Sequence, residues 1–169
     1  MKLRNKILLL LCGFITLSCS DTKNDYLIKV YEQPGESGAA GYVNTKGDTV
    51  IAAGKYIRCY TDTIKSFGVV MTEDDRLIGI DKDQKELFEV FWFDNGPDYI
   101  SDGLFRIVKN NKIGYADETG KIIIEPRYDC AYPFENEVAK VSNNCTTVQE
   151  GEHSAWVSDD WKVIHKNGK

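Results

Sequence analysis

A short pattern recurs along this chain, and it constrains the fold more than any other feature. The best copy, GYADETGKIII at 114–124, has a glycine beside an aromatic residue, a polar turn and an aliphatic run. The segment GYVNTKGDTVI at 41–51 matches it position by position. Two looser copies start at Gly79 and Ala155, so the four starts are 38, 35 and 41 residues apart. A recurring period of this size predicts a repeat array.

Each unit is expected to form β-strands. Ile113 and Tyr115 alternate with smaller residues in the period-2 pattern of a strand. Asn110 and Asn111 tolerate the positive φ that a tight hairpin needs, and Pro126 ends a strand because it has no amide donor. We therefore predict an all-β fold: an array of short antiparallel β-hairpin repeat units that forms a curled or propeller-like sheet.

Two glycines inside the expected strands, Gly79 and Gly114, are predicted to occupy the same position of the unit. Glycine normally weakens a strand, so its presence there indicates that a neighbouring backbone or ring comes too close for a side chain. In the fourth copy, Ala155 is expected in the glycine position and Trp156 in the aromatic position.

The first 18 residues predict a signal peptide. Lys2, Arg4 and Lys6 form a basic region, and an apolar stretch follows at 7–17. As a helix this stretch would span about 16 Å, roughly half of a hydrocarbon core of ~30 Å. It is therefore too short to cross a membrane and suits the apolar region of a signal.

The residues before Cys19 resemble the lipobox of bacterial lipoproteins, although Thr16 stands where that family prefers leucine. The resemblance implies that Cys19 is lipidated once residues 1–18 are removed, and that 19–25 form the lipidated cysteine and a tether. Two or three acyl chains would give a stable anchor. The expected location is the bacterial cell envelope, on its periplasmic side or at the cell surface. The alternative is an ordinary secretory signal cleaved nearby.

Charge limits the partners of the processed chain. Removing three of the 21 basic residues leaves 18 against 26 acidic ones, a net charge of −8. An acidic domain repels nucleic acid, so no nucleic-acid partner is expected.

Three cysteines remain after Cys12 and Cys19 are set aside: Cys59, Cys130 and Cys145. An odd number leaves at least one free thiol. Cys130 and Cys145 flank the expected strand 138–141 from opposite ends, and a strand rises ~3.3 Å per residue, so we predict no essential disulfide. Without a CxxC pair or a suitably spaced histidine, the sequence predicts no metal site and no cofactor.

The segment GYADETGKIIIEPRYDCAYPFENEVAKV at 114–141 resembles the WG repeat (KWG) family. It has the Gly-aromatic pair, the Asp before a glycine turn, Lys with an aliphatic run, and Pro-x-Tyr-Asp. Weaker copies extend the resemblance from 41 to 164. The resemblance implies a WG-like β-repeat domain at 26–169, of a kind frequent on exported bacterial proteins. The family carries no known reaction and no shared binding residue.

The run Phe91, Trp92 and Phe93 is the candidate binding site. Consecutive strand residues point to opposite faces, so at least one of the three should leave the core. An exposed ring beside Asp94 and Asp98 could contact a sugar or a peptide, so a protein or glycan partner is expected.

Carboxylates offer less specific alternatives. Asp94, Asp98 and Asp102 surround a loop and could bind calcium, although aspartates next to Gly-Pro are ordinary turn residues. Glu125 and Asp129 could act as paired carboxylates, although strand-end roles are the simpler interpretation.

The sequence favours an envelope-anchored lipoprotein whose β-repeat domain is a binding or scaffolding module rather than an enzyme. Two alternatives stay open. One is a hydrolase that uses Glu125, Asp129 or the cluster from Asp94 to Asp102. The other is a small acidic immunity or inhibitor lipoprotein that neutralises a basic partner.

Overall fold

The structure, a computed structural model, describes residues 25–33, 37–151 and 153–169. This part of the chain forms 18 strands and has no helix, so it holds no helix able to span a membrane. The all-β prediction is confirmed. The predicted signal peptide at 1–18, the lipidation site Cys19 and most of the tether lie outside the described residues.

The strands form three sheets and two separate hairpins, with every pair antiparallel. The N-terminal sheet has the order β3–β2–β1–β5 and consists of β1 (Leu27–Gln33), β2 (Ser37–Val43), β3 (Thr49–Ile51) and β5 (Thr63–Ile64). The central sheet has the order β13–β12–β11–β8–β7–β6–β4 and consists of β4 (Arg58–Cys59), β6 (Gly68–Met71), β7 (Leu77–Ile80), β8 (Glu86–Val90), β11 (Leu104–Lys109), β12 (Lys112–Asp117) and β13 (Ile122–Tyr128).

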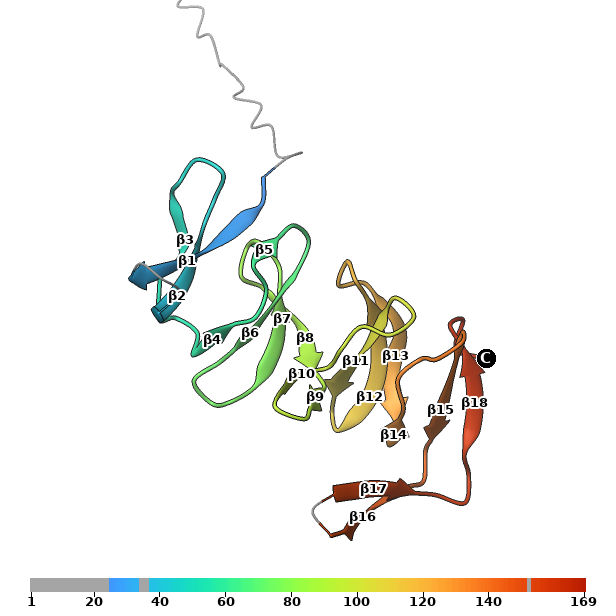
Figure 1. Cartoon of the computed structure of the whole chain (residues 1–169). Coiled ribbons are helices and arrows are strands. Elements are labelled where there is room, and N and C mark those ends of the chain that lie inside the picture. Colours follow the sequence, from blue (N-terminus) through green and yellow to red (C-terminus); the bar gives the residue numbers. More distant parts are fainter. Residues whose placement is uncertain (1–24, 34–36, 152) are drawn as a thin grey trace, which may run out of the picture.

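The C-terminal sheet has the order β14–β15–β18 and consists of β14 (Cys130–Ala131), β15 (Val138–Ser142) and β18 (Lys162–His165). The separate hairpins pair β9 (Trp92–Phe93) with β10 (Gly96–Pro97), and β16 (Thr146–Glu150) with β17 (His153–Val157). Figure 1 shows the units following one another in a curved row, in sequence order, from the blue end to the red end. The arrangement is a curled array of small antiparallel sheets.

The same turn follows β2, β7, β12 and β18 and aligns the four units. It begins at Asn44, Asp81, Asp117 and His165. In each case the first amide donates to the fifth carbonyl, and the fourth amide donates to the first carbonyl, at 2.8 to 3.1 Å. In the first three turns, the side-chain Oδ1 of the first residue accepts two further backbone amides. Such Asx turns explain why Asn or Asp recurs there.

Aligned on this turn, Gly41 and Gly114 occupy the same position, next to Tyr42 and Tyr115. Both tyrosines are fully buried, and each hydroxyl donates to a backbone carbonyl further along the chain, at 2.6 and 2.7 Å. Burial raises the pKa of both hydroxyls, which therefore stay protonated as donors. The predicted match between the first and third copies is confirmed.

Gly79 occupies the tyrosine position instead, so its predicted equivalence to Gly114 is wrong. It lies opposite Phe88 on the neighbouring strand, as Tyr115 lies opposite Ile124. The second copy has one residue fewer between its glycine and its turn, which shifts the glycine by one place. The ring of Phe88 fills the space above Gly79 that a tyrosine takes in the first and third units.

The predicted register of the fourth copy is also wrong. Strand β18 pairs with β15 as β12 pairs with β11, so Lys162 and Val163 take the glycine and tyrosine positions. Ala155 and Trp156 belong to β17, in a hairpin inserted between β15 and β18. The strand AWV in this insertion resembles a repeat start in sequence, but its partner is β16.

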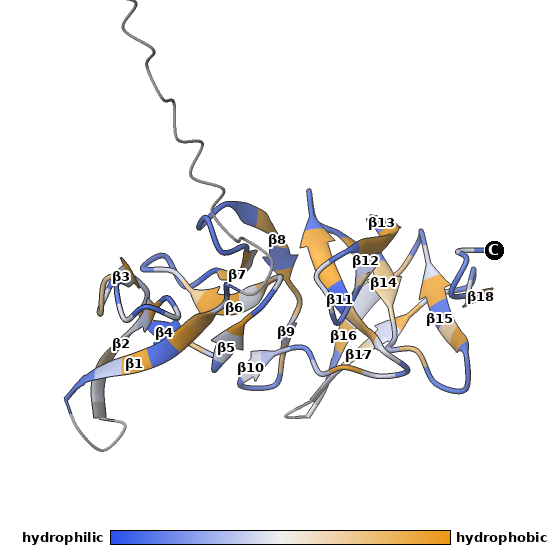
Figure 2. Cartoon of the chain, turned by 90° about the horizontal axis from the view of Figure 1, so that it is seen from above, coloured by the Kyte–Doolittle hydropathy of each residue, from blue (hydrophilic) through white to orange (hydrophobic). Residues whose placement is uncertain are grey.

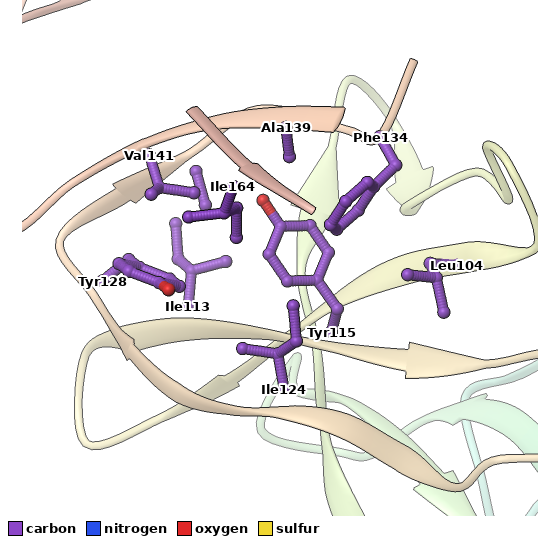
Figure 3. Close-up of a cluster of buried hydrophobic side chains, with 10 residues drawn as sticks. Leu104, Ile113, Tyr115, Ile124, Tyr128, Phe134, Ala139, Val141 and Ile164 are labelled. Carbon is purple, nitrogen blue, oxygen red and sulfur yellow. The ribbon is translucent and has the colours of Figure 1, made fainter. Parts of the chain in front are cut away.

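Three hydrophobic clusters, which we call N-terminal, central and C-terminal, lie between successive units. Most strands in the middle of the row are buried on both faces. Figure 2 shows apolar residues concentrated on the strands and polar ones in the turns. Tyr115 points into the C-terminal cluster, whereas its neighbour Ala116 points into the central one. In the C-terminal cluster (Figure 3), Tyr115 packs edge-on against Phe134 with ring centroids 4.8 Å apart. Because each cluster joins two units, no unit buries its apolar residues alone.

Cys130 and Cys145 form a disulfide, with Cα atoms 6.2 Å apart, so the predicted obstacle to this bridge does not exist. The prediction placed the two cysteines at opposite ends of β15. A turn at Glu135 folds β14 back along β15, and Cys130 lies opposite Ser142, near Cys145. Cys59 is a buried free thiol, which confirms that at least one thiol stays unpaired.

Candidate binding pocket

Two segments depart from the repeat plan. In the linker between the third and fourth units, the amide of Tyr132 donates to the carbonyl of Lys140 on β15. Three residues later, the amide of Glu135 donates to the carbonyl of Val138 and begins a turn. In the linker between the second and third units, the amides of Phe91 and Ser101 make the corresponding bonds to β11. The hairpin β9–β10 is inserted between Phe91 and Ser101. The second departure is the hairpin β16–β17. It replaces the tight turn that Asn110 and Asn111, both with positive φ, form between β11 and β12.

These two insertions wall the same open pocket, whose volume is about 960 Å³. We call it the aromatic pocket, because six of its lining residues carry aromatic rings: Phe91, Trp92, Phe93, Tyr99, Tyr132 and Trp156. The β9–β10 insertion and the residues after it provide the first side, and β16–β17 with the linker to the fourth unit provides the second. Insertions into repeats gather on one face, which is often the binding face.

The three aromatic residues singled out in the sequence take different roles. Phe91 packs against the C-terminal cluster and meets Trp156 edge-on, with ring centroids 5.9 Å apart. Trp92 and Phe93 are 44% and 46% exposed, which confirms that at least one of the three leaves the core. Phe93 packs edge-on against Tyr99, with ring centroids 5.2 Å apart. The binding role of these residues stays a prediction.

A buried ion pair between Arg106 and Asp98 lies next to the pocket, behind the ring of Phe91. Arg106 donates to Asp98 from Nε at 2.9 Å and from Nη2 at 2.5 Å, and the Asp98 carboxylate also accepts the Arg106 amide at 2.8 Å. The guanidinium lies over the ring of Phe91, 4.2 Å from its centroid, and 5.5 Å from that of Phe93. The Asp98 side chain is completely buried, so it holds the insertion to β11 and does not stand beside the exposed rings as expected.

Sequence reasoning missed Arg106, although a signal was present. It is a single charged residue between Phe105 and Ile107, inside the apolar run 104–108 of β11. A buried charge needs a partner, and the acidic loop just before the strand supplies one. Trp156 was noticed, but only as a repeat position.

The rim of the pocket is acidic. Asp94 and Glu135 line it and are exposed, and within the described part of the chain neither forms a salt bridge. The indole Nε1 of Trp92 donates to the Asp94 carbonyl at 2.7 Å, which orients the ring. Arg106 is the cation among the described lining residues, and Asp98 already neutralises it.

The loop aspartates do not gather as calcium ligands. Asp98 binds Arg106, and Asp102 accepts the amide of Glu137 at 2.8 Å. Asp94 and Asp102 have φ of 52° and 53°, as turn residues do. Over residues 25–33, 37–151 and 153–169, no group of three or more potential metal-binding side chains is found.

The other carboxylates considered for catalysis lie outside the aromatic pocket. Glu125 is exposed on β13, and Asp129 is 2.5 Å from the Lys112 ammonium. Neither lines the pocket, and the Asp129 carboxylate serves an ion pair between two strand ends.

Comparison with known proteins identifies one segment. The sequence model described as "WG containing repeat" matches residues 113–144, from within β12 to just beyond β15. No curated protein and no solved structure matches the chain. The matched segment includes Tyr132 and Glu135 of the aromatic pocket but neither insertion. The chain therefore carries a WG repeat at residues 113–144, within an all-β array of similar units.

Proposed function

We propose that this protein is an envelope-anchored lipoprotein whose β-repeat domain is a non-catalytic binding or scaffolding module, and that it binds a protein or glycan partner in the aromatic pocket. The observation that carries the binding role is that both insertions into the repeat frame wall one pocket. The repeat frame does not require the inserted hairpin β16–β17, because the third unit joins the corresponding strands, β11 and β12, with a two-residue turn. The meeting of two such insertions, far apart in the sequence, at one pocket therefore points to a function of the pocket.

The exposed rings support the same proposal. Trp92, Phe93 and Tyr99 are each more than 40% exposed and lie together. Leaving apolar surface in water costs roughly 25 cal/mol per Å², and clustered exposed aromatic residues are typical of interaction sites. The carboxylates of the hydrolase alternative are spread over separate contacts, whereas these rings converge.

The anchor part of the proposal rests on the sequence around Cys19. Changing Cys19→Ala should release the domain from the membrane fraction or leave the precursor uncleaved. Labelling with a fatty-acid analogue should disappear as well, because the acylated sulfur is gone. A Cys19→Ala chain that still takes up the label would contradict the anchor.

The binding part is tested by capture from envelope extract with the processed domain. We expect the variant Trp92→Ala/Phe93→Ala to lose the captured partner. The matched control is Ile57→Ser/Val163→Ser, which removes two exposed apolar side chains that do not line the pocket, 58% and 65% exposed. Equal capture by both variants would show that the aromatic pocket is not the binding site.

A further inference from the structure

We infer that the aromatic pocket takes a basic protein segment, with a lysine or arginine side chain seated among its rings and its carboxylates. The inference rests on the proposed binding function and names the chemistry of the partner. The alternative partner, a glycan, is an outcome of the test.

Charge is the first argument. The rim carries Asp94 and Glu135, and the one cation among the described lining residues, Arg106, is held by Asp98. The pocket thus presents two carboxylates without a compensating cation on the described rim. The processed chain has a net charge of −8, 18 basic against 26 acidic residues, which favours the approach of a basic partner and disfavours an acidic one.

The rings are the second argument, because aromatic faces attract cations. The inner rings already do so in this structure: the Arg106 guanidinium lies 4.2 Å from the Phe91 centroid. Next to the pocket, the Lys140 ammonium lies 4.7 Å from the centroid of Trp161, which contacts Tyr132. A cation from a partner would find Trp92 exposed in the same pocket, directly beside Asp94.

Size is the third argument. A pocket of about 960 Å³ is larger than one side chain requires and lies at the upper end of the range for bound ligands. It is open to solvent, so a peptide segment can approach its rings from outside. A backbone in this position would also meet the hydroxyl-bearing residues Thr147 and Ser154 of the inserted hairpin.

The test uses the tryptophan fluorescence of the processed chain. We would titrate it with a pentapeptide of alternating glycine and lysine, with the glutamate version of that peptide, and with maltotetraose. We expect the lysine peptide to bind and the other two not to bind. Its affinity should fall several-fold as salt is raised from about 0.05 to about 0.5 M, because salt screens the rim charges.

The decisive variants neutralise charge without changing shape. Asp94→Asn keeps a residue that tolerates positive φ, and Glu135→Gln keeps the length of the side chain. Together they should weaken the lysine peptide about fivefold, given the modest strength of two exposed charge contacts. The control Asp83→Asn/Glu118→Gln removes the same net charge at exposed turns outside the pocket and should leave the affinity unchanged.

Each outcome is decisive. Failure of the lysine peptide to bind, or equal weakening by the rim variant and its control, overturns the inference. Tighter binding of the glutamate peptide or of maltotetraose also overturns it, while pocket-dependent capture from the extract would leave the proposed function standing. Capture that does not depend on Trp92 and Phe93 would remove the proposed function as well.

Discussion

At the scale of single residues, the repeat depends on a glycine that leaves room for a neighbouring backbone. A Cβ on Gly114 would lie 2.5 Å from the nitrogen of Pro126, and one on Gly41 would lie 2.7 Å from the nitrogen of Ala53. In both units the backbone after the partner strand crosses close to the glycine Cα, and in the third unit the pairing of β12 with β13 is irregular at Gly114. Neither glycine has a positive φ, so the requirement is space and not backbone conformation.

The first prediction follows from this crowding. Gly114→Val should destabilise the domain by more than ~2 kcal/mol, because a backbone cannot move aside as a side chain can. Gly79→Val should cost less, since the nearest atoms belong to the ring of Phe88. Denaturant melts measure both. Strand propensity alone predicts stabilisation by valine, so a neutral Gly114→Val would contradict the packing explanation.

The control for this experiment is Lys109→Val, an exposed position on β11 that should change little. Lys112, on the same hairpin, is unsuitable because its ammonium is 2.5 Å from Asp129. Its loss would remove an ion pair as well as a side chain.

A second residue-scale prediction concerns Asp117, whose carboxylate organises the third turn. Burial acts to raise its pKa, but bonds from Thr119 and from two backbone amides outweigh burial, and the pKa is lowered. A lowered folded pKa contributes stability above the unfolded value of ~3.9, and this contribution is lost as the pH falls through the folded pKa.

Asp117→Asn separates the charge from the turn. Asn44 makes the same two amide bonds in the first unit, so asparagine should keep the turn. We expect the wild type to exceed this variant by less than ~1 kcal/mol at pH 7, because the group is exposed, and the difference should shrink below about pH 4. Asp117→Ala should be about 1 kcal/mol less stable than Asp117→Asn at every pH, because neither side chain titrates and only asparagine keeps the turn bonds. A wild-type advantage that grows on acidification would refute this assignment.

At the scale of elements, the two inserted hairpins are held to the frame by different means. Asp98 ties the end of β9–β10 to Arg106 of β11 through a buried ion pair. The base of β16–β17 is joined through Cys145 to Cys130 of β14. Each insertion is therefore fixed to the frame at its base.

The disulfide is expected to stabilise the domain. Cys130 and Cys145 are 15 residues apart, and closing a loop of that length is worth about 3 kcal/mol in the chain-entropy account. The variant Cys130→Ser/Cys145→Ser should lose about this much in a denaturant melt. Adding reductant should reproduce the loss in the wild type and leave the variant unchanged. A wild type that melts identically with and without reductant would contradict the stabilising role.

The sequence was informative for elements whose identity depends on local pattern. Strand alternation and the Asn110–Asn111 turn predicted the β12 hairpin, and the Gly-Tyr pair predicted the match between the first and third units. Sequence patterns did not predict features that depend on the pairing of distant strands. The partner of β15 is β18 and not the closer β17, and no local pattern distinguishes them. The position of Cys130 depends on a turn at Glu135, which was not predicted from the sequence.

The candidate site was predicted in part for the same reason. Trp92 and Phe93 are recognisable because three consecutive aromatic residues cannot all face one core. That Trp156 lies across from them depends on how the fourth unit packs against the third, which one unit's sequence does not contain. The burial of Asp98 likewise depends on Arg106 in another strand.

At the scale of the whole molecule, the frame is a curved row of units joined by three shared clusters, and the aromatic pocket is an addition to it (Figure 1). Neighbour-dependent burial makes the units cooperative. The pocket lies where the third and fourth units meet, with its rings above the C-terminal cluster. The frame and the pocket are therefore separable parts of the molecule.

The measurement that tests this separation most directly is capture from envelope extract by a chain without the second insertion. Residues 144–159 would be replaced by Asn-Gly, which restores the tight turn of the third unit between β15 and β18, in a Cys130→Ser background. The reference is Cys130→Ser/Cys145→Ser. We predict that the shortened chain still unfolds cooperatively and captures no partner that the reference captures. Loss of folding, or capture equal to that of the reference, would contradict the account.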